Sequence, residues 1–519
     1  MERKVVGNEA LEEFRERLLR WDELCAQLRE LYYRYLDLAA FRSEKCYFPG
    51  RKCVRSWKRK YDVGDLTLMW TYVLNTAPLC GKLMRALAEV EYQMRKRALE
   101  SLEKYGGVEK SSNPRKGAKI VHIRLKEPVY AYLVLMDDKL YVLWKEFEYT
   151  SKDGRKRFAE ITRKILGIIN RYKRGEVVDV EVSEFEVDRE YERLWLEVPL
   201  PEGTSKLLGG RGKAPVALFR NLGWLLSDDS RVWLSHTSAN SGQVALRLFD
   251  WIALARYATD VLEKAPSGLL MFKLAIYYVV KTEEGDNPKI EMWPINTTTE
   301  VIRSVYGLFG ITLSEPEEVL ARGYAVLKAL REASFKREGK TYVVDDVGAW
   351  IAFSNVVDML IVGDGFVMPT ELGIVAKTSP KATLTGETTR INKLAEALGC
   401  RASKKDVRLH TWHMRLLLPT PHTPAFEKTV KLFETLANYP VAAIVEINGA
   451  RYLLTYEGNS RFVIGKKKGS ALYEFVNQLG LRMRAKKGVF VLTYAQLKEL
   501  AKFVPVRLLN EVDKDSTRE

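Results

Sequence analysis

The chain has few cysteines, no long apolar run and no recognisable export signal. Five cysteines occur in 519 residues, and none forms the C-x-x-C spacing of a zinc site. Because they are odd in number and scattered, we expect no disulfide framework and a reducing, cytoplasmic location. The longest apolar run, at 269–280, is too short to span a bilayer and contains Lys273. The first residues, MERKVVGNEALEEF, lack the apolar core of a signal peptide. These absences argue against a secreted or membrane-embedded protein.

Several familiar catalytic patterns are also missing. No G-x-S-x-G sequence stands at a strand–helix junction, which argues against a hydrolase with a nucleophile elbow. The segment PEGTSKLLGGRGK at 201–213 resembles a phosphate loop, but Leu207 stands where the first glycine should be and alanine follows Lys213. We therefore interpret it as a flexible basic loop.

Histidines are scarce, and three of the five lie close together in HTWHMRLLLPTPH as His410, His413 and His422. On a strand, residues three apart point to opposite faces, so the first two cannot easily share one metal ion. A zinc site would need further ligands, and surface or packed histidines are the competing interpretation. His236 has no partner that the sequence identifies.

Positive charge is what the chain has in excess. It contains 83 Lys+Arg against 67 Asp+Glu, a formal net charge of +16. Such a field favours a polyanionic partner, nucleic acid rather than a membrane surface. The most informative segment, RKCVRSWKRKY at 51–61, interleaves Trp57 and Tyr61 with cations, so that phosphates would pair with the charges and bases lie on the rings. A solvated loop is the competing interpretation.

Two further basic sets follow, one around the turn near 401–408 and one comprising 466–468 and 482–487. The residues that we predict to bind nucleic acid are Arg51, Lys52, Arg55, Trp57, Lys58, Arg59, Lys60, Arg211, Lys213, Lys377, Lys381, Arg390, Arg401, Lys404, Lys405 and Arg408.

Apolar periodicity and turn signals predict an α+β, multidomain protein. Spacings of three and four residues predict helices over 9–39 and 65–105, within a basic helical region at 1–105. Alternation predicts strands on either side of a helix at 158–173, forming a small α/β domain at 119–200. The C-terminal half is expected to use one plan twice, in units at 214–345 and 346–510.

Two apolar helices of this half end in a similar way. The helix expected at 214–228 ends in LGWLLSDDS (222–230), and the one at 349–363 ends in VDMLIVGDG (357–365). A carboxylate at a helix C-terminus opposes the negative end of the helix dipole. It is tolerated where glycines are needed for a tight turn or where the acid holds a cation. Ordinary turns after core helices are the competing interpretation.

These two segments resemble the motif of the LAGLIDADG family. Aligned by position, Asp229 and Asp364 both fall on the acidic eighth position, and Leu225 and Leu360 fall on the fourth. The resemblance implies α-β-β-α-β-β-α units whose motif helices pack together, with acids that bind Mg²⁺ over the DNA backbone. It assigns catalysis to Asp229 and Asp364, and metal binding to these two and Asp228.

The match to this motif is degenerate. Gly223, Ser227 and Gly363 supply the small residues that the motif helices need, but Trp224, Asp358 and Met359 do not, and Ser230 replaces a glycine. The stretch 240–510, including GYAVLKAL and VDDVGAWIAFSN, also resembles the archaeal PaRep repeat-encoded family, which implies a mobile-element-like origin and no established activity.

The sequence therefore predicts a cytoplasmic, monomeric protein that binds nucleic acid, DNA rather than RNA, and that cleaves it with Mg²⁺. One alternative keeps the scaffold without the chemistry, as a DNA-binding or regulatory protein. Another is a structural or interaction protein whose basic charge reflects its host cytoplasm. Acids that meet at the ends of two packed helices favour the nuclease, and acids that lie apart favour the binding protein.

Overall fold

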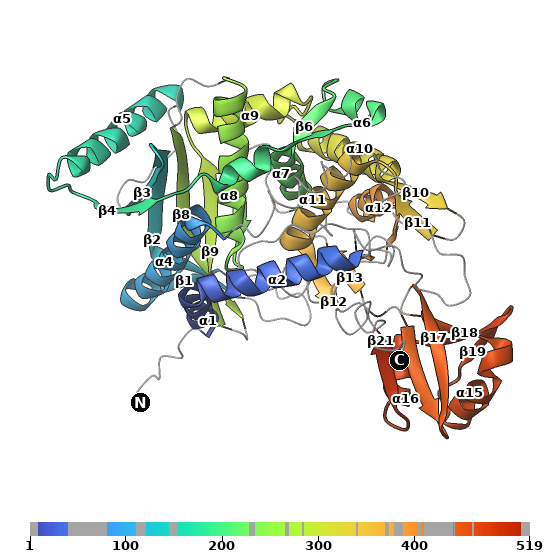
Figure 1. Ribbon diagram of the computed structural model, residues 1–519. Helices are drawn as coiled ribbons and strands as arrows, with labels where there is room; N and C mark the ends of the chain where they lie inside the picture. The colour runs from blue at the N-terminus through green and yellow to red at the C-terminus, as the bar shows by residue number, and fades with distance from the viewer. Residues whose placement is uncertain are drawn as a thin grey trace, which may run out of the picture.

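The computed structural model (Figure 1) has a mixed α/β architecture with several antiparallel sheets, which confirms the α+β class. The residues that the structure describes are 9–39, 80–110, 121–144, 154–227, 234–264, 269–282, 285–338, 341–368, 373–377, 388–402, 406–408, 440, 442–458 and 461–509.

The N-terminal helices are α1 (Glu9–Leu19), α2 (Trp21–Ala39) and α4 (Lys82–Tyr105). The helix expected at 9–39 is thus two helices that meet at Arg20. The ring of Phe14 in α1 packs edge-on against Tyr92 in α4, with 6.0 Å between ring centroids. The amphipathic periodicity of both segments explains this packing, because each helix buries one apolar face.

The expectation that the cysteines form no disulfide is wrong for one pair. Cys25 of α2 is bonded to Cys80, which lies just before α4 and 55 residues along the chain. The packing of the N-terminal helices brings the two thiols together, and no local spacing encodes that meeting. The cysteine pattern therefore no longer indicates a reducing compartment.

The largest sheet has seven antiparallel strands in the order β4-β3-β2-β8-β9-β7, with β1 paired to β2. The strands are β1 (Gly107–Lys110), β2 (Val121–Met136), β3 (Lys139–Trp144), β4 (Glu181–Glu186), β7 (His236–Ser238), β8 (Leu270–Thr282) and β9 (Gly285–Pro294). Because β2 pairs with β8, the boundary expected between 119–200 and 214–345 does not separate two sheets.

Helices cover both faces of this sheet. On one face, Leu133, Val142 and Leu274 belong to the large core that includes buried residues of α4 and of α8 (Gln243–Arg256). On the other, α5 (Gly154–Lys173) packs over β2, β3 and β4, where Tyr132 and Ile169 share a second core. In Figure 1, α5 lies on the left of the sheet, α8 lies on its right, and α4 crosses over its lower part.

The segment between β4 and the central helices departs from expectation. A strand is predicted at 193–200, but Glu190–Trp195 form a 3-10 helix (η3), followed by β5 (Glu197–Pro199). Tyr191 and Leu194, three residues apart, are both buried, and a helical turn points them the same way. The expected loop at 201–213 contains α6 (Glu202–Leu207), and β6 (Lys213–Pro215) pairs with β5.

Two helix–strand units share one strand order. The first runs α7 (Val216–Leu226), β7, α8, a π-helical turn η4 (Tyr257–Val261), β8, β9 and α9 (Thr297–Leu308). The second runs α11 (Val347–Asp364), β12 (Gly365–Met368), β13 (Gly373–Lys377), α12 (Thr388–Ala397), β14 (Arg401–Ala402) and β15 (Asp406–Arg408). The neighbours are β7-β9-β8 in one and β13-β15-β14 in the other, all antiparallel. Between the units lie α10 (Pro316–Ser334), β10 (Phe335–Glu338) and β11 (Thr341–Val344).

The C-terminal domain, residues Ala442–Leu509, has a sheet of its own rather than belonging to the unit expected at 346–510. Its six strands have the order β19-β20-β18-β17-β16-β21, and it lies at the lower right of Figure 1. Its elements are β16 (Ala442–Ile447), β17 (Ala450–Gly458), β18 (Arg461–Gly465), α15 (Lys466–Gln478), β19 (Arg484–Lys486), β20 (Val489–Thr493), α16 (Tyr494–Leu500) and β21 (Val506–Leu509).

Candidate functional site

The central helices α7 and α11 cross in close contact at Gly223. A Cβ atom placed on Gly223 would lie 2.6 Å from the Cβ of Met359 and 2.6 Å from the carbonyl oxygen of Val356. Only glycine leaves room for this approach of two helix backbones, so the expected role of Gly223 at a helix contact is confirmed. Asp358, which departs from the motif, is buried in the same turn of α11.

The two helices start at the same place and run in the same direction. Gly348, in the first turn of α11, lies against the carbonyl oxygen of Pro199. Pro199 pairs with Lys213 in the β5–β6 hairpin, and that hairpin leads directly into α7. The C-terminal ends of both helices therefore point the same way.

The predicted acids lie at or beyond these ends. Asp364 is the last residue of α11 and is followed at once by β12. Helix α7 ends at Leu226, and the hydroxyl of Ser227 donates to the carbonyl of Gly223 at 3.0 Å. Asp228 and Asp229 lie outside the described residues.

A fully buried polar network joins α7 to α8. The Asp250 carboxylate accepts hydrogen bonds from Nε of Arg220 at 2.6 Å and from Nε1 of Trp224 at 2.7 Å. Arg247 donates to Oδ1 of Asn221 at 2.6 Å, and Arg220, Arg247 and Asp250 all have no solvent-exposed surface. Buried charges are costly unless paired, so this network fixes how the first unit's helices sit against each other.

His236, for which the sequence identifies no partner, packs beside this network. Its imidazole lies edge-on to the ring of Trp224, with 5.1 Å between ring centroids, and the residue is fully buried. His236 therefore belongs to the buried core that packs against α7. His410, His413 and His422 lie outside the described residues.

A face of the seven-stranded sheet carries aromatic rings interleaved with cations. The Lys273 ammonium lies 5.2 Å from the centroid of the Tyr130 ring and 5.6 Å from that of Trp293, and Tyr277 packs edge-on against Tyr130. Nearer β1, Nζ of Lys110 donates to the Tyr278 hydroxyl at 2.9 Å. These aromatic rings are half-buried, a state suited to contact with bases or sugars, whereas Lys273 between them is buried, with 6% of its surface exposed.

Two more cations share this face through strand register. Arg124 is directly opposite Tyr278 across β2 and β8, and Tyr278 is opposite Lys289 across β8 and β9. Residues directly opposite in a sheet lie on the same face. We name Lys110, Arg124, Tyr130, Lys273, Tyr277, Tyr278, Lys289 and Trp293 the aromatic–cation face.

The aromatic–cation face was not predicted from the sequence. The sequence predicts that the run 269–281 forms a hairpin with 289–295, which β8 and β9 confirm, but it assigns no face to the side chains of this strand. Lys273 and Tyr277 are four residues apart and lie on the same side of it. The sequence signal for such a face is that polar and aromatic residues recur at every second position along these strands.

The cations predicted to bind nucleic acid fall into three groups. Arg211 is exposed, with its guanidinium 5.6 Å from the Phe309 ring centroid, while Lys213 pairs with Glu197. In the second unit, Lys377 ends β13, Arg390 lies in α12, and Arg401 of β14 is directly opposite Arg408 of β15. The remainder lie outside the described residues: Arg51, Lys52, Arg55, Trp57, Lys58, Arg59, Lys60, Lys381, Lys404 and Lys405.

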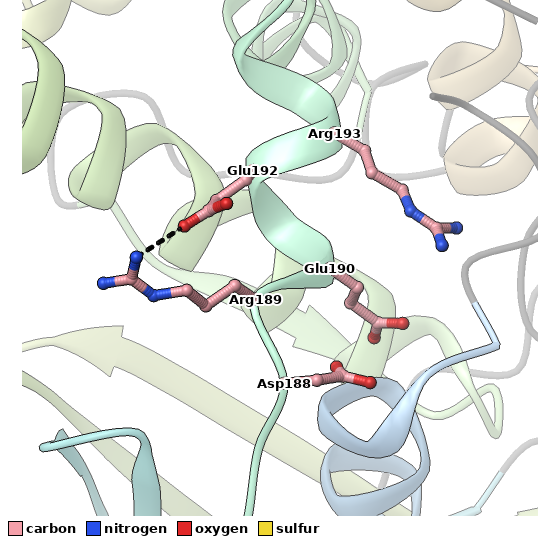
Figure 2. A pocket seen from close by; sticks show the side chains of 5 residues that line it. All are labelled: Asp188, Arg189, Glu190, Glu192 and Arg193. Carbon is pink, nitrogen blue, oxygen red and sulfur yellow. Dashed lines mark ion pairs between the residues drawn. The ribbon is translucent and has the colours of Figure 1, made fainter. Parts of the chain in front are cut away.

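A shallow pocket lies beside the start of α4 (Figure 2), lined by Asp188, Arg189, Glu190, Glu192 and Arg193. Glu190 accepts a hydrogen bond from the Met84 amide at 2.9 Å and Asp188 accepts one from the Lys82 amide at 3.3 Å, so both acids cap α4. Burial, with a smaller contribution from the Asp188 charge, raises the pKa of Glu190 to about 7. The Arg189–Glu192 ion pair, at 3.2 Å, faces away from these two acids.

Within the described ranges, no three His, Cys, Asp or Glu side chains gather as a metal site would require. None of the helices in those ranges is long and apolar enough to cross a membrane. Comparison of the chain with protein-family models, with curated proteins and with solved structures gave no match.

Proposed function

We propose that this chain binds duplex DNA and cleaves its backbone with a divalent metal held at the paired ends of α7 and α11. The observation that carries the proposal is the register of the helix crossing. In the motif alignment Gly223 corresponds to Asp358, and the groups nearest to Gly223 belong to Val356 and Met359, on either side of that position.

This register supports a meeting of the two acids. Asp229 is six residues beyond Gly223, and Asp364 is six residues beyond Asp358. Asp364, at the end of α11, lies about 9 Å beyond the crossing at the rise of an α-helix, and Asp229 follows the end of α7 by three residues in the sequence. Carboxylates and free backbone carbonyls at two helix ends are the oxygen ligands that Mg²⁺ prefers.

The order of elements in the two units gives further support. The second unit has the α-β-β-α-β-β order that the LAGLIDADG resemblance implies, and the first repeats the neighbours of its last three strands. A chain that builds the same unit twice around one helix pair places equivalent helix ends together.

The roles divide between the helix ends and the sheets. Asp229 and Asp364, with Asp228 beside them, would hold Mg²⁺, which supplies charge neutralisation at the scissile phosphate and an activated water. The aromatic–cation face, together with Arg401 and Arg408, would hold the sugar–phosphate backbone through charge and ring contacts. These contacts position the duplex without requiring cleavage, so an inactive DNA-binding protein is the second candidate.

The test compares Asp364→Asn with Asp179→Asn, which changes an exposed acid of another part of the chain. We expect Asp364→Asn to lower Mg²⁺-dependent cleavage of plasmid DNA by roughly a hundredfold or more, as loss of an electrostatic group in a catalytic site does. Affinity for duplex DNA should stay within about twofold of wild type, because other residues contact the phosphates. Asp179→Asn should change neither quantity.

Thermal melting provides a second readout on the same samples. Asp364→Asn should leave the metal-free protein as stable as wild type or more stable, because a like-charge pair is relieved. Mg²⁺ should raise the melting temperature of wild type only. Cleavage that is equal in both variants would refute the role of Asp364. Salt-sensitive binding without any cleavage would select the inactive DNA-binding protein, and no binding at low salt would refute both.

A further inference from the structure

The C-terminal domain gathers two basic segments at one end of its sheet. Gly465, the last residue of β18, is directly opposite Val489 of β20, which is directly opposite Lys486 of β19. The first turn of α15 follows Gly465 immediately, and the turn joining β19 to β20 follows Lys486. The basic cluster consists of Lys466, Lys467, Lys468, Lys486 and Lys487 at this end of the sheet, together with Arg484 farther along β19 and Arg482 near the other end of β20, where its carbonyl oxygen accepts a hydrogen bond from Gln496.

The charge of the basic cluster is exposed and uncompensated. All seven side chains are exposed, and among the residues that the structure describes none of them takes part in an ion pair. Elsewhere in the same domain, Arg451 pairs with Glu446 at 2.6 Å and Lys502 pairs with Glu499 at 2.7 Å. From Arg461 to Lys498, both included, the sequence has nine cations and a single acid, Glu474, so the acids of this segment do not balance the charge of the cluster.

A purely structural role does not account for this arrangement. Exposed cations on an edge strand prevent pairing with other sheets, which would explain Arg484 and Lys486 on β19. It does not explain the three lysines in the first turn of α15, because the N-terminus of a helix already carries partial positive charge. No side chain caps that helix at Gly465. The lysines are electrostatically unfavourable there unless an anion binds.

The surface of the basic cluster selects the kind of anion. Its nearest rings, Tyr473 and Phe490, stack on each other with 4.2 Å between centroids, and Phe490 is buried. The exposed large apolar side chains of this domain are Leu453 of β17 and Phe503 beside β21, away from β19. Cations spread over two elements, beside two rings that already stack on each other, suit the phosphates of a duplex backbone.

We propose that the basic cluster is a second nucleic-acid contact, which binds the phosphate backbone of duplex DNA without reading its sequence. The basic cluster shares only the class of partner with the proposed function. It belongs to the C-terminal domain, whereas α7, α11 and the aromatic–cation face belong to other parts of the fold. Because the contact is to phosphates, it raises affinity on every sequence by a similar factor.

The test measures how affinity of the full-length protein for a 30-base-pair duplex depends on salt, in EDTA so that no cleavage occurs. The variant is Lys467→Gln with Lys487→Gln. The matched control is Arg451→Gln with Lys502→Gln, which lowers net charge equally but removes cations that already have acidic partners. We expect the slope of log affinity against log salt concentration to fall by roughly two units in the variant, about one for each phosphate that the protein no longer neutralises. The control should keep the wild-type slope.

Several outcomes would overturn the inference. One is an unchanged slope in the variant, and another is an equal loss in the control. Aggregation of the variant with wild-type binding would assign the cations to edge protection, and binding of anionic phospholipid vesicles in place of DNA would assign them to a membrane surface. Melting curves establish that both variants are folded. Loss of cleavage in Asp364→Asn is measured separately, so the proposed function and this inference fail independently.

Discussion

The part of the protein around α7 and α8, which we call the central body, and the C-terminal domain differ in where their charged side chains lie. Around α7 and α8, charges are buried and each has a defined partner, as in the pairs Arg220–Asp250 and Glu91–Arg95, the latter at 2.8 Å. On the C-terminal domain, the cations of the basic cluster are exposed and have no acidic partner among the described residues. Buried pairs fix the arrangement of helices, whereas exposed unpaired cations add binding capacity at little cost in stability. Substitutions in the two regions should therefore differ in size and in kind.

The largest difference is expected for removal of one partner of a pair. Asp250→Ala leaves the buried Arg220 guanidinium without its carboxylate, and we expect a loss of about 3–5 kcal/mol in unfolding free energy. Glu499→Ala removes the partner of Lys502 on the surface of the C-terminal domain and should cost less than about 1 kcal/mol. Urea denaturation followed by tryptophan fluorescence measures both.

A double variant keeps this test decisive if Asp250→Ala is too unstable to purify. Arg220→Met with Asp250→Leu removes both charges and should restore part of the stability, because an apolar pair of similar volume can replace a buried ion pair. The rest stays lost, because Nε1 of Trp224 no longer has an acceptor, which costs about 1–3 kcal/mol. A loss in Asp250→Ala no larger than in Glu499→Ala would break the comparison.

The pH dependence of stability at Glu190 tests the comparison further. Glu190 is a buried acid of the central body, and the charge of Asp188 beside it has the same sign. Burial raises its pKa to about 7 in the folded protein, above the ordinary value of 4.5. The folded state then binds the proton more tightly, so this contribution to stability is present at low pH and is lost as pH rises towards 7. Glu190→Gln keeps an acceptor for the Met84 amide and should stabilise the protein by roughly 3 kcal/mol at pH 8, but hardly at pH 4.

The control for Glu190 is Glu474→Gln on the C-terminal domain, an exposed acid whose replacement should change stability by less than about 0.5 kcal/mol at either pH. Melting temperatures of both variants across this pH range provide the measurement. A Glu190→Gln effect that does not depend on pH would show that the carboxyl does not titrate with folding.

The smallest effect concerns packing. Gly223→Ala places a methyl group 2.6 Å from a carbonyl oxygen and from a Cβ atom, so we expect a loss of about 1–3 kcal/mol. Gly465→Ala on the C-terminal domain adds a methyl group where nothing lies within 4 Å, at an ordinary φ of −61°, and should be neutral or slightly stabilising. Equal unfolding free energies for the two variants would contradict the close helix crossing.

Local patterns predicted elements better than their partners. Helix α11 was expected at 349–363 and spans Val347–Asp364, because a long apolar run bounded by an acid and a glycine leaves little choice. The pairing of β2 with β8 joins segments about 150 residues apart, so the division expected at 200–214 does not coincide with a break in the sheet, and no local pattern encodes that register. The hairpin expected at 441–456 is confirmed by β16 and β17, but its place in a separate C-terminal sheet was not predicted, for the same reason.

The candidate site was predicted in part. Gly223 could be assigned to a helix contact because a family pattern requires a small residue there. Arg220 and Asp250 could not, since charged residues are usually exposed and the sequence does not show that these two meet in the core. The cations of the aromatic–cation face were missed because Lys273 stands in an apolar run and Lys110 comes from a separate strand.

The bond between Cys25 and Cys80 has a consequence for the integrity of the chain. It closes a covalent ring that contains the segment RKCVRSWKRKY at 51–61, with its cations and rings. A protease cut within that segment would open the ring without separating the two pieces, which would stay joined until the bond is reduced. The N-terminal helices therefore remain attached to the body after such a nick, and the two fragments part only under reducing conditions.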